Sequence, residues 1–390
     1  MIQPHLPSRW ETTCLADAGE IVSGVTLGRN LNGSHTRRVP YLRVANVKDG
    51  RLDLPDIYET DATDTEIKKL KLAQGDLVLT EGGDADKLGR ATFWNDELPE
   101  CIHQNHIFRV RLNRSRFDPA FVAALLASPY GRAYFARHAK QTTGIATINR
   151  RVLSAFPLCA PTLPIQIRIA ARLREQLAEV ERARAAVAAQ LQGAETLIEA
   201  LLRDSLRSAA QYQLHECLRE VTEGIGQNWK AFPLLGATRA GLAPAKDPVG
   251  KSPERYKPVR VGTIFYNPMR ILLGSVAMVD EGDEPGITSP DYVVMRGVEN
   301  KVHPRWFYYW FRSSNGAEFI KSVSRGAVRE RLLFRRLAKA SVPVPAWGAQ
   351  EVFAKQVREI RQMKASLTER LNLLEKIPSA LLHEAFSGRF

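Results

Sequence analysis

Two short patterns in the sequence contain the residue types of nucleic-acid enzymes. Asp56, Glu66 and Lys68 have the composition of a metal-dependent nuclease site, where two carboxylates and a lysine act on one phosphate, but their spacing is loose. The segment 267–269 (NPM) shares two letters with the Asn-Pro-Pro-aromatic loop of amino-methyltransferases and lacks the second proline and the aromatic residue. No Walker loop, HExxH motif or glycine-rich cofactor loop accompanies them. We therefore expect no catalytic residues in this chain and no cofactor bound by it.

A third group has the side chains of a metal site. His103 and His106 lie close to Cys101 in the sequence, and all three are common metal ligands. In a strand, however, side chains three positions apart point to opposite faces. We expect polar residues that face solvent or DNA here, and no metal.

The charge balance points to an anionic partner. The chain of 390 residues has a formal net charge of +13 and a pI of about 9.7. Counted along the sequence, about +3 falls in residues 1–162, about +1 in 163–210, about +7 in 211–347 and about +2 in 348–390. Because the excess belongs to 1–162 and 211–347, we expect these parts to bind the anion.

Polar loop residues in both halves have the chemistry of DNA recognition. They combine arginine and lysine donors for phosphate with amides and other groups that read base edges. Any one of them, taken alone, is better explained as a solvated surface charge, and the set is the stronger signal. The candidate DNA-binding residues are Arg29, Arg37, Arg38, Arg43, Asn46, Lys87, Arg90, His103, Gln104, Asn105, Thr143, Lys251, Lys257, Arg260, Asn267, Arg270, Arg325 and Arg329.

Two long helical segments separate and follow these loop-rich parts. Their apolar residues recur every seven positions with a second row beside them, as in a helix that pairs with another helix. Arg184 and Lys364 interrupt the seams at matching positions, where each either sets the register or extends from a seam edge. Pro378 is expected to bend or end the second seam. The predicted seam residues are Leu173, Leu177, Val180, Val187, Leu191, Ile198, Leu201, Phe353, Val357, Ile360, Leu367, Leu371, Leu374 and Leu381.

The two seams are related by a shift of about 180 residues, which indicates an internal duplication. We predict an α+β fold with two strand-rich domains, 1–162 and 211–347. Each domain is followed by a long helix, 163–210 and 348–390, and the two helices pair as an antiparallel coiled coil. Residues 212–260 differ most from their counterpart, so their fold is not predicted.

Composition excludes two classes of protein. No run of about eighteen apolar residues is present, so we expect no membrane partner and a cytoplasmic location. The four cysteines at 14, 101, 159 and 217 have no CxxC spacing, and we expect reduced thiols.

The order of several motifs resembles the specificity subunit of type I restriction-modification systems. They are 75–80 (GDLVLT), 89–91 (GRA), 101–106 (CIHQNH), 128–131 (SPYG), 143–144 (TG), 164–170 (PIQIRIA) and 381–388 (LLHEAFSG). The family's Glu-Gln pair at the start of the helix is here Ile165-Gln166, and again Ala349-Gln350, so the glutamine is kept and the glutamate is not.

The resemblance implies a prokaryotic DNA-binding subunit without catalysis of its own. Each strand-rich domain would be a target recognition domain for one half of a bipartite site on double-stranded DNA, and the helices would set the spacing. The partners would be two modification subunits and, through them, restriction subunits. S-adenosylmethionine, ATP and Mg²⁺ would belong to those partners. The alternatives are a coiled-coil scaffold for other proteins, or an active methyltransferase or nuclease.

Overall fold

The computed structural model describes residues 6–31, 35–83, 88–142, 145–324 and 331–387. The chain divides into two compact units. Unit 1 comprises residues 1–186 and 370–390, and unit 2 comprises residues 187–369. The division falls inside the two long helices, so each unit contains one strand-rich domain together with a part of each helix.

The centre of unit 1 is a four-stranded antiparallel sheet with the strand order β2-β11-β7-β9. Leu77 and Leu79 pack into one hydrophobic cluster, and Val78 between them packs into another. Because neighbouring side chains in a strand point to opposite faces, the continuous apolar run of β7 reflects a sheet covered on both sides. The strands are β2 (Gly19–Ser23), β11 (Ile107–Leu112), β7 (Leu77–Thr80) and β9 (Ala91–Phe93).

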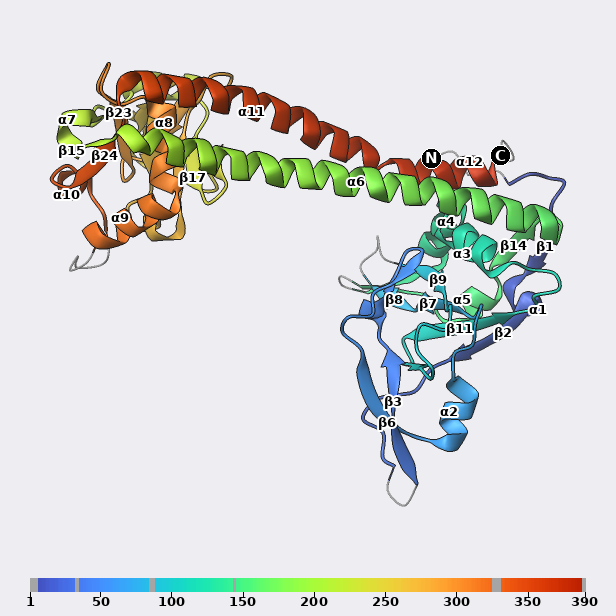
Figure 1. Cartoon of the computed structure of the whole chain (residues 1–390). Helices are drawn as coiled ribbons and strands as arrows, with labels where there is room; N and C mark the ends of the chain where they lie inside the picture. The colour runs from blue at the N-terminus through green and yellow to red at the C-terminus, as the bar shows by residue number, and fades with distance from the viewer. Residues whose placement is uncertain (1–5, 32–34, 84–87, 143–144, 325–330, 388–390) are drawn as a thin grey trace. The chain divides into compact units, whose positions relative to one another are not determined.

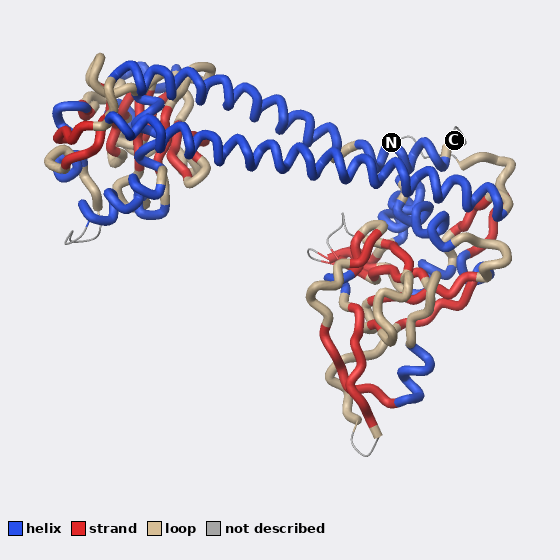
Figure 2. Tube along the Cα trace, viewed as in Figure 1, coloured by secondary structure: helices blue, strands red, loops and turns tan. Residues whose placement is uncertain are grey.

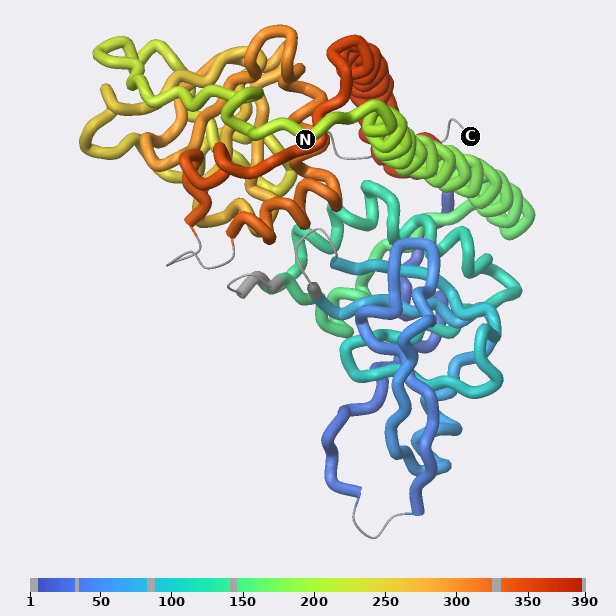
Figure 3. Tube along the Cα trace, turned by 60° about the vertical axis from the view of Figure 1, so that its left-hand side comes forward, coloured from blue at the N-terminus to red at the C-terminus, as the bar shows by residue number. Residues whose placement is uncertain are grey.

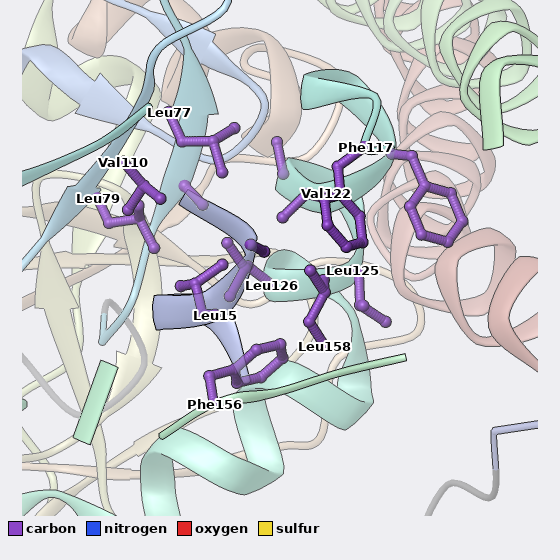
Figure 4. Packing of buried hydrophobic residues seen from close by; sticks show 14 of the residues in the cluster. Leu15, Leu77, Leu79, Val110, Phe117, Val122, Leu125, Leu126, Phe156 and Leu158 are labelled. Atoms are coloured by element: carbon purple, nitrogen blue, oxygen red, sulfur yellow. The ribbon is translucent and has the colours of Figure 1, made fainter. Parts of the chain in front are cut away.

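Two helices cover one face of this sheet. The helices α3 (Pro119–Ala127) and α4 (Pro129–His138) each begin with a proline, and the side chains of Asp118 and Ser128 cap them. Figure 4 shows side chains of α3 meeting those of β7 and β11 in this core. Each fully buried leucine or phenylalanine there contributes about 1.5–3 kcal/mol.

An extended arm of unit 1 lies at the end of the unit away from α6 (Figures 1 and 3). It consists of the antiparallel pair β3 (Thr36–Leu42) and β6 (Tyr58–Thr63), with β10 (Ile102–His103) added in parallel to β3. The helix α2 (Asp64–Leu70) follows directly, since Thr63 and Glu66 form a capping box at its first turn. The remaining elements of unit 1 are β1 (Glu11–Cys14), α1 (Leu15–Ala18), a 3-10 turn (Val44–Asn46), β4 (Val47–Lys48), β5 (Arg51–Leu52), β8 (Gly82–Gly83), β12 (Lys140–Thr142), β13 (Ile145–Thr147), α5 (Arg150–Ser154) and β14 (Pro157–Ala160).

Unit 2 repeats the sheet of unit 1 in the same strand order. Its four strands are arranged β16-β23-β20-β21, and all neighbours are antiparallel. The strands are β16 (Leu218–Glu220), β23 (Val293–Gly297), β20 (Thr263–Tyr266) and β21 (Val276–Met278), and the helices α8 (Pro304–Arg312) and α9 (Ser314–Ser324) correspond to α3 and α4. The duplication inferred from the sequence is therefore present in the topology.

The front of unit 2, whose fold the sequence does not predict, is partly the same and partly new. A short strand, one helical turn and a second strand repeat β1, α1 and β2, after which small hairpins replace the arm of unit 1. The elements of this front are β15 (Ala210–Gln213), α7 (Leu214–Cys217), a 3-10 helix (Gly226–Ala231), β17 (Leu235–Thr238), β18 (Gly241–Pro244), a 3-10 turn (Pro253–Arg255) and β19 (Lys257–Val259). Further along unit 2 lie a 3-10 turn (Ile271–Leu273), β22 (Gly286–Thr288), α10 (Phe334–Leu337) and β24 (Ser341–Val344).

The repeat extends to single hydrogen bonds. Gln166 and Gln350 are 1% and 0% exposed, and each accepts a bond from the backbone N–H of a helix N-cap residue and donates to two carbonyls. The bonds join Gln166 to Asp118 N (3.0 Å), Arg116 O (2.9 Å) and Pro161 O (2.8 Å), and Gln350 to His303 N (2.8 Å), Lys301 O (2.9 Å) and Pro345 O (2.8 Å). Each glutamine thus fastens the start of a long helix to its own domain.

The long helices are α6 (Leu163–Ser205), which Figure 2 shows without interruption, α11 (Trp347–Leu374) and α12 (Ile377–Phe386). As expected, Pro378 lies in the first turn after a break. Every predicted seam residue is buried or half-buried. Within unit 2, Ile198 of α6 and Val357 of α11 belong to one cluster.

Ion pairs also attach α11 to the strand-rich part of unit 2. Asp280 and Arg305 are each 4% exposed, and their atoms Oδ1 and Nη2 lie 2.5 Å apart. Arg361 of α11 also pairs with Asp280, and Arg358 pairs with Glu281 at 3.1 Å. Asp280 therefore pairs both with Arg305 of the strand-rich part and with Arg361 of α11.

Candidate nucleic-acid interface

Four of the candidate arginines lie in the arm of unit 1 or in the segments next to it, and each has a carboxylate partner. Arg29 pairs with Glu66, Arg37 with Asp64 and Glu100, and Arg38 with Glu59. Arg43 lies over the Tyr58 ring at 3.6 Å and pairs with Asp56 at 3.0 Å. Their charges are largely compensated within the chain, so as DNA contacts they remain predictions.

The pair of Arg29 and Glu66 shows how strongly this arm is braced. The guanidinium makes two bonds of 2.8 Å to the carboxylate, which also accepts the backbone N–H of Thr63. These bonds, with that of Arg29 first, lower the pKa of Glu66 to about 2. Arg29 therefore joins α2 to the segment before β3.

Two candidates are buried, which corrects the expectation that they face solvent or DNA. Asn46 is 2% exposed because its side chain bonds the backbone of Arg43, Asp53 and Asp56. His103 is 0% exposed and packs against Gly24, where a Cβ atom would overlap its backbone. Burial, and then the charge of Arg109, lowers the pKa of His103 to about 4, so the ring is neutral.

The loop candidates of unit 1 lie at the edges of its sheets. Gln104 and Asn105 are half-buried in the turn between β10 and β11. Arg90, which follows the β7–β9 turn, lies 4.0 Å from Asp49. Lys87 and Thr143 lie outside the described residues. His106, one of the considered metal ligands, instead pairs with Glu81 at 2.8 Å, and the described part of the chain contains no group of three metal-ligating side chains.

Among the described residues, the charged candidates of unit 2 pair with fewer carboxylates than those of unit 1. Lys251, Arg260 and Arg270 are exposed. Lys257 donates to the carbonyl of Tyr292 at 2.8 Å, and burial lowers its pKa. Asn267 shapes its own turn by accepting the N–H of Met269, whereas Arg325 and Arg329 lie outside the described residues.

The structure adds basic residues that the sequence did not single out. Arg239, Arg312 and Lys321 line an open hollow of about 200 Å³ whose apolar lining includes Ile271 and Phe311. These residues come from four separate elements or turns, so no spacing in the sequence connects them. Unit 2 thus presents cationic side chains at this hollow, in agreement with the larger net charge of residues 211–347 than of residues 1–162.

The architecture is a duplicated strand-rich unit with basic surface residues, each copy followed by a long helix, which is the arrangement that the resemblance to specificity subunits of type I restriction-modification systems implies. None of the described helices combines the length and apolar character needed to cross a bilayer.

The comparisons with known proteins confirm this resemblance. No family model matches the chain. A putative type I restriction enzyme specificity subunit, MjaX, of Methanocaldococcus jannaschii is 19% identical over 99% of this chain and 94% of its own length. The EcoKI specificity subunit of Escherichia coli K12 is 24% identical over 43% of this chain and 36% of its own. The HsdS subunit of Thermoanaerobacter tengcongensis shares the fold over 99% of this chain and 98% of its own length, with 15% sequence identity and a TM-score of 0.56. A chain from a structural study of complex assembly and conformational transition in the type I R-M system matches with a TM-score of 0.69 at 14% identity, over 99% and 100% of the two chains.

Proposed function

We propose that this chain is the DNA-reading specificity subunit of a type I restriction-modification system. The observation that carries the proposal is the duplication, since both units have the same sheet order and the same buried glutamine contacts. One chain with two copies of a recognition fold is suited to read two half-sites, each with its own loops. Full-length similarity to a specificity subunit supports the same function.

In this proposal α6 and α11 pair antiparallel and set the distance between the half-sites. Support comes from within each unit. In unit 2 the two helices share a hydrophobic cluster, and Lys364 of α11 pairs with Glu195 of α6. In unit 1, Leu173 of α6 and Phe386 of α12 belong to one cluster. A regular apolar seam together with this ion pair gives such a spacer a defined register.

In this proposal the catalytic reactions are carried out by partner subunits. The modification subunits, two per specificity subunit, would bind S-adenosylmethionine and methylate the target, and restriction subunits would use ATP and Mg²⁺. The chain itself contributes affinity through its cations and specificity through a few base contacts in each unit. DNA binding by the assembled complex should therefore weaken steeply as salt rises.

Methylome mapping tests the proposal directly. Long-read sequencing of the host genome, with and without this gene, should show methylation at a bipartite site that disappears with the gene. The gene product purified alone should modify no DNA with S-adenosylmethionine or Mg²⁺. Turnover by the isolated chain, or an unchanged methylome after deletion, would refute the proposal.

The spacer is tested by changing the length of the helices. One heptad inserted into both α6 and α11 preserves the seam while lengthening the pair by roughly 10 Å, about three base pairs of DNA. We expect the same two half-sites with a longer gap between them. Unchanged spacing in the mapped sites would contradict the spacer role.

A further inference from the structure

The turn between β20 and β21 holds apolar side chains out into solvent. Asn267 accepts the backbone N–H of Met269 at 2.9 Å, and the 3-10 turn that follows ends at Gly274 in the left-handed region, with φ of 79°. Ile271 points inward and is 2% exposed, whereas Met269 is 66% and Leu273 is 70% exposed. Hydrogen bonds within the turn fix its backbone, so the exposure of Met269 and Leu273 follows from the conformation of the turn.

Basic side chains lie in and beside this turn. Arg270 lies between Met269 and Leu273 in the turn and is exposed. Arg239, Arg312 and Lys321 line the hollow beside the turn, and among the described residues no carboxylate pairs with these three cations or with Arg270. Arg312 bonds the carbonyls of Arg239 and Val276, which hold its charge in place without neutralising it. The helix α9 contributes one acid, Glu318.

Exposed apolar side chains next to cations match the surface chemistry of DNA more closely than the surface chemistry of a typical protein. Phosphates flank the grooves and pair with cations, and the methyl group of thymine is the one apolar group at a base edge in the major groove. The corresponding segment of unit 1, between β7 and β9, has the sequence 81–90 (EGGDADKLGR), which contains three acids and whose leucine, Leu88, is 3% exposed. The two units thus differ in chemistry at the same place in the fold.

We propose that Met269 and Leu273 read thymine methyl groups in the half-site bound by unit 2, with Arg270 on an adjacent phosphate. The inference rests on the proposed function and names the specificity chemistry of one unit. Each methyl group contacted is worth about a fourfold change in affinity, if it is buried as completely as a methylene group in a protein core. The corresponding turn of unit 1 should show no such dependence.

The test uses the complex of the full chain with its modification subunits and a duplex carrying the mapped site. Thymine is replaced by deoxyuridine, which removes the methyl group alone, at each position of both half-sites in turn. The wild-type complex should lose about fourfold in affinity at one or more positions of a single half-site. Leu273→Ala or Met269→Ala should bind the normal site more weakly and no longer distinguish thymine from deoxyuridine there.

Two further variants separate this effect from general loss of binding. Val261, at the other end of β20, is 54% exposed and apolar, so Val261→Ala is the matched control and should retain the full thymine preference. Arg270→Ala should weaken binding to all sequences alike and reduce the salt slope by about one. Because the changed side chains are exposed, melting temperatures should stay the same.

Three outcomes would overturn the inference while leaving the proposed function intact. They are an unchanged deoxyuridine penalty in Leu273→Ala and Met269→Ala, a mapped site without thymine in the half-site of unit 2, and variants that lose modification subunits during purification. The last would make the turn a protein interface. Failure of the wild-type complex to bind its mapped site would instead contradict the proposed function itself.

Discussion

Replacing the buried glutamine of unit 2 by leucine tests how the long helix is fastened to its domain. Gln350→Leu keeps the side chain close in size but leaves the N–H of His303 and the carbonyls of Lys301 and Pro345 without their partner. An unsatisfied buried polar group costs about 1–3 kcal/mol, so three cost roughly 3–6 kcal/mol after the gain from a more apolar side chain. For a unit of this size the melting temperature should fall by on the order of 10 °C.

Urea unfolding followed by tryptophan fluorescence measures the loss, and hydrogen exchange locates it at the amide of His303. Gln166→Leu should have the same effect on unit 1 because its three bonds are equivalent. Gln362 is exposed on α11, so Gln362→Leu is the control and should change stability by less than about 0.5 kcal/mol. If Gln350→Leu were as stable as this control, the fastening role of the glutamine would be wrong.

Three more predictions concern burial and charge. Asp280→Asn removes the buried one of the two carboxylates that pair with Arg305 and should destabilise unit 2 by about 3–5 kcal/mol in urea unfolding. Gly131→Ala should destabilise unit 1 because its Cβ would overlap the carbonyl of Leu126, whereas Gly193→Ala, with nothing within 4 Å, should raise stability by up to about 1 kcal/mol. The pKa of His103 falls from 6.5 to about 4 on folding, so stability present above pH 6.5 should be lost as pH falls toward 4, by roughly 3 kcal/mol.

Each of these has a control within the chain. The pair of Asp291 with Arg331 is exposed and 4.0 Å long, so Asp291→Asn should have little effect on unfolding. His103→Leu should remove the slope in stability between pH 6.5 and 4, whatever its effect at neutral pH. A slope that persists in this variant would assign the pH dependence to other groups.

The chemical character of the candidate site was predictable from the sequence, but the exposure of its individual residues was not. The sequence indicated basic loops, and unit 2 presents such a surface. The prediction for His103 was wrong because a polar residue in a short strand looks the same in the sequence whether that face is covered or open. Neither Asn46 nor the exposed Leu273 was distinguishable from its neighbours by residue type, since exposure depends on which segments pack over each position.

The sequence by itself determined the duplication, the order of the elements and the helical seams, because periodicity and motif order are recorded within short stretches of chain. The tertiary structure determined which carboxylate pairs with each arginine. Glu66 neutralises Arg29 from 37 residues away, and Glu100 neutralises Arg37 from 63. Contacts over such separations exist once the strands have paired, and no spacing in the sequence encodes them. Folding therefore selected which cations remain uncompensated, and with them the surface of unit 2 that we propose reads DNA.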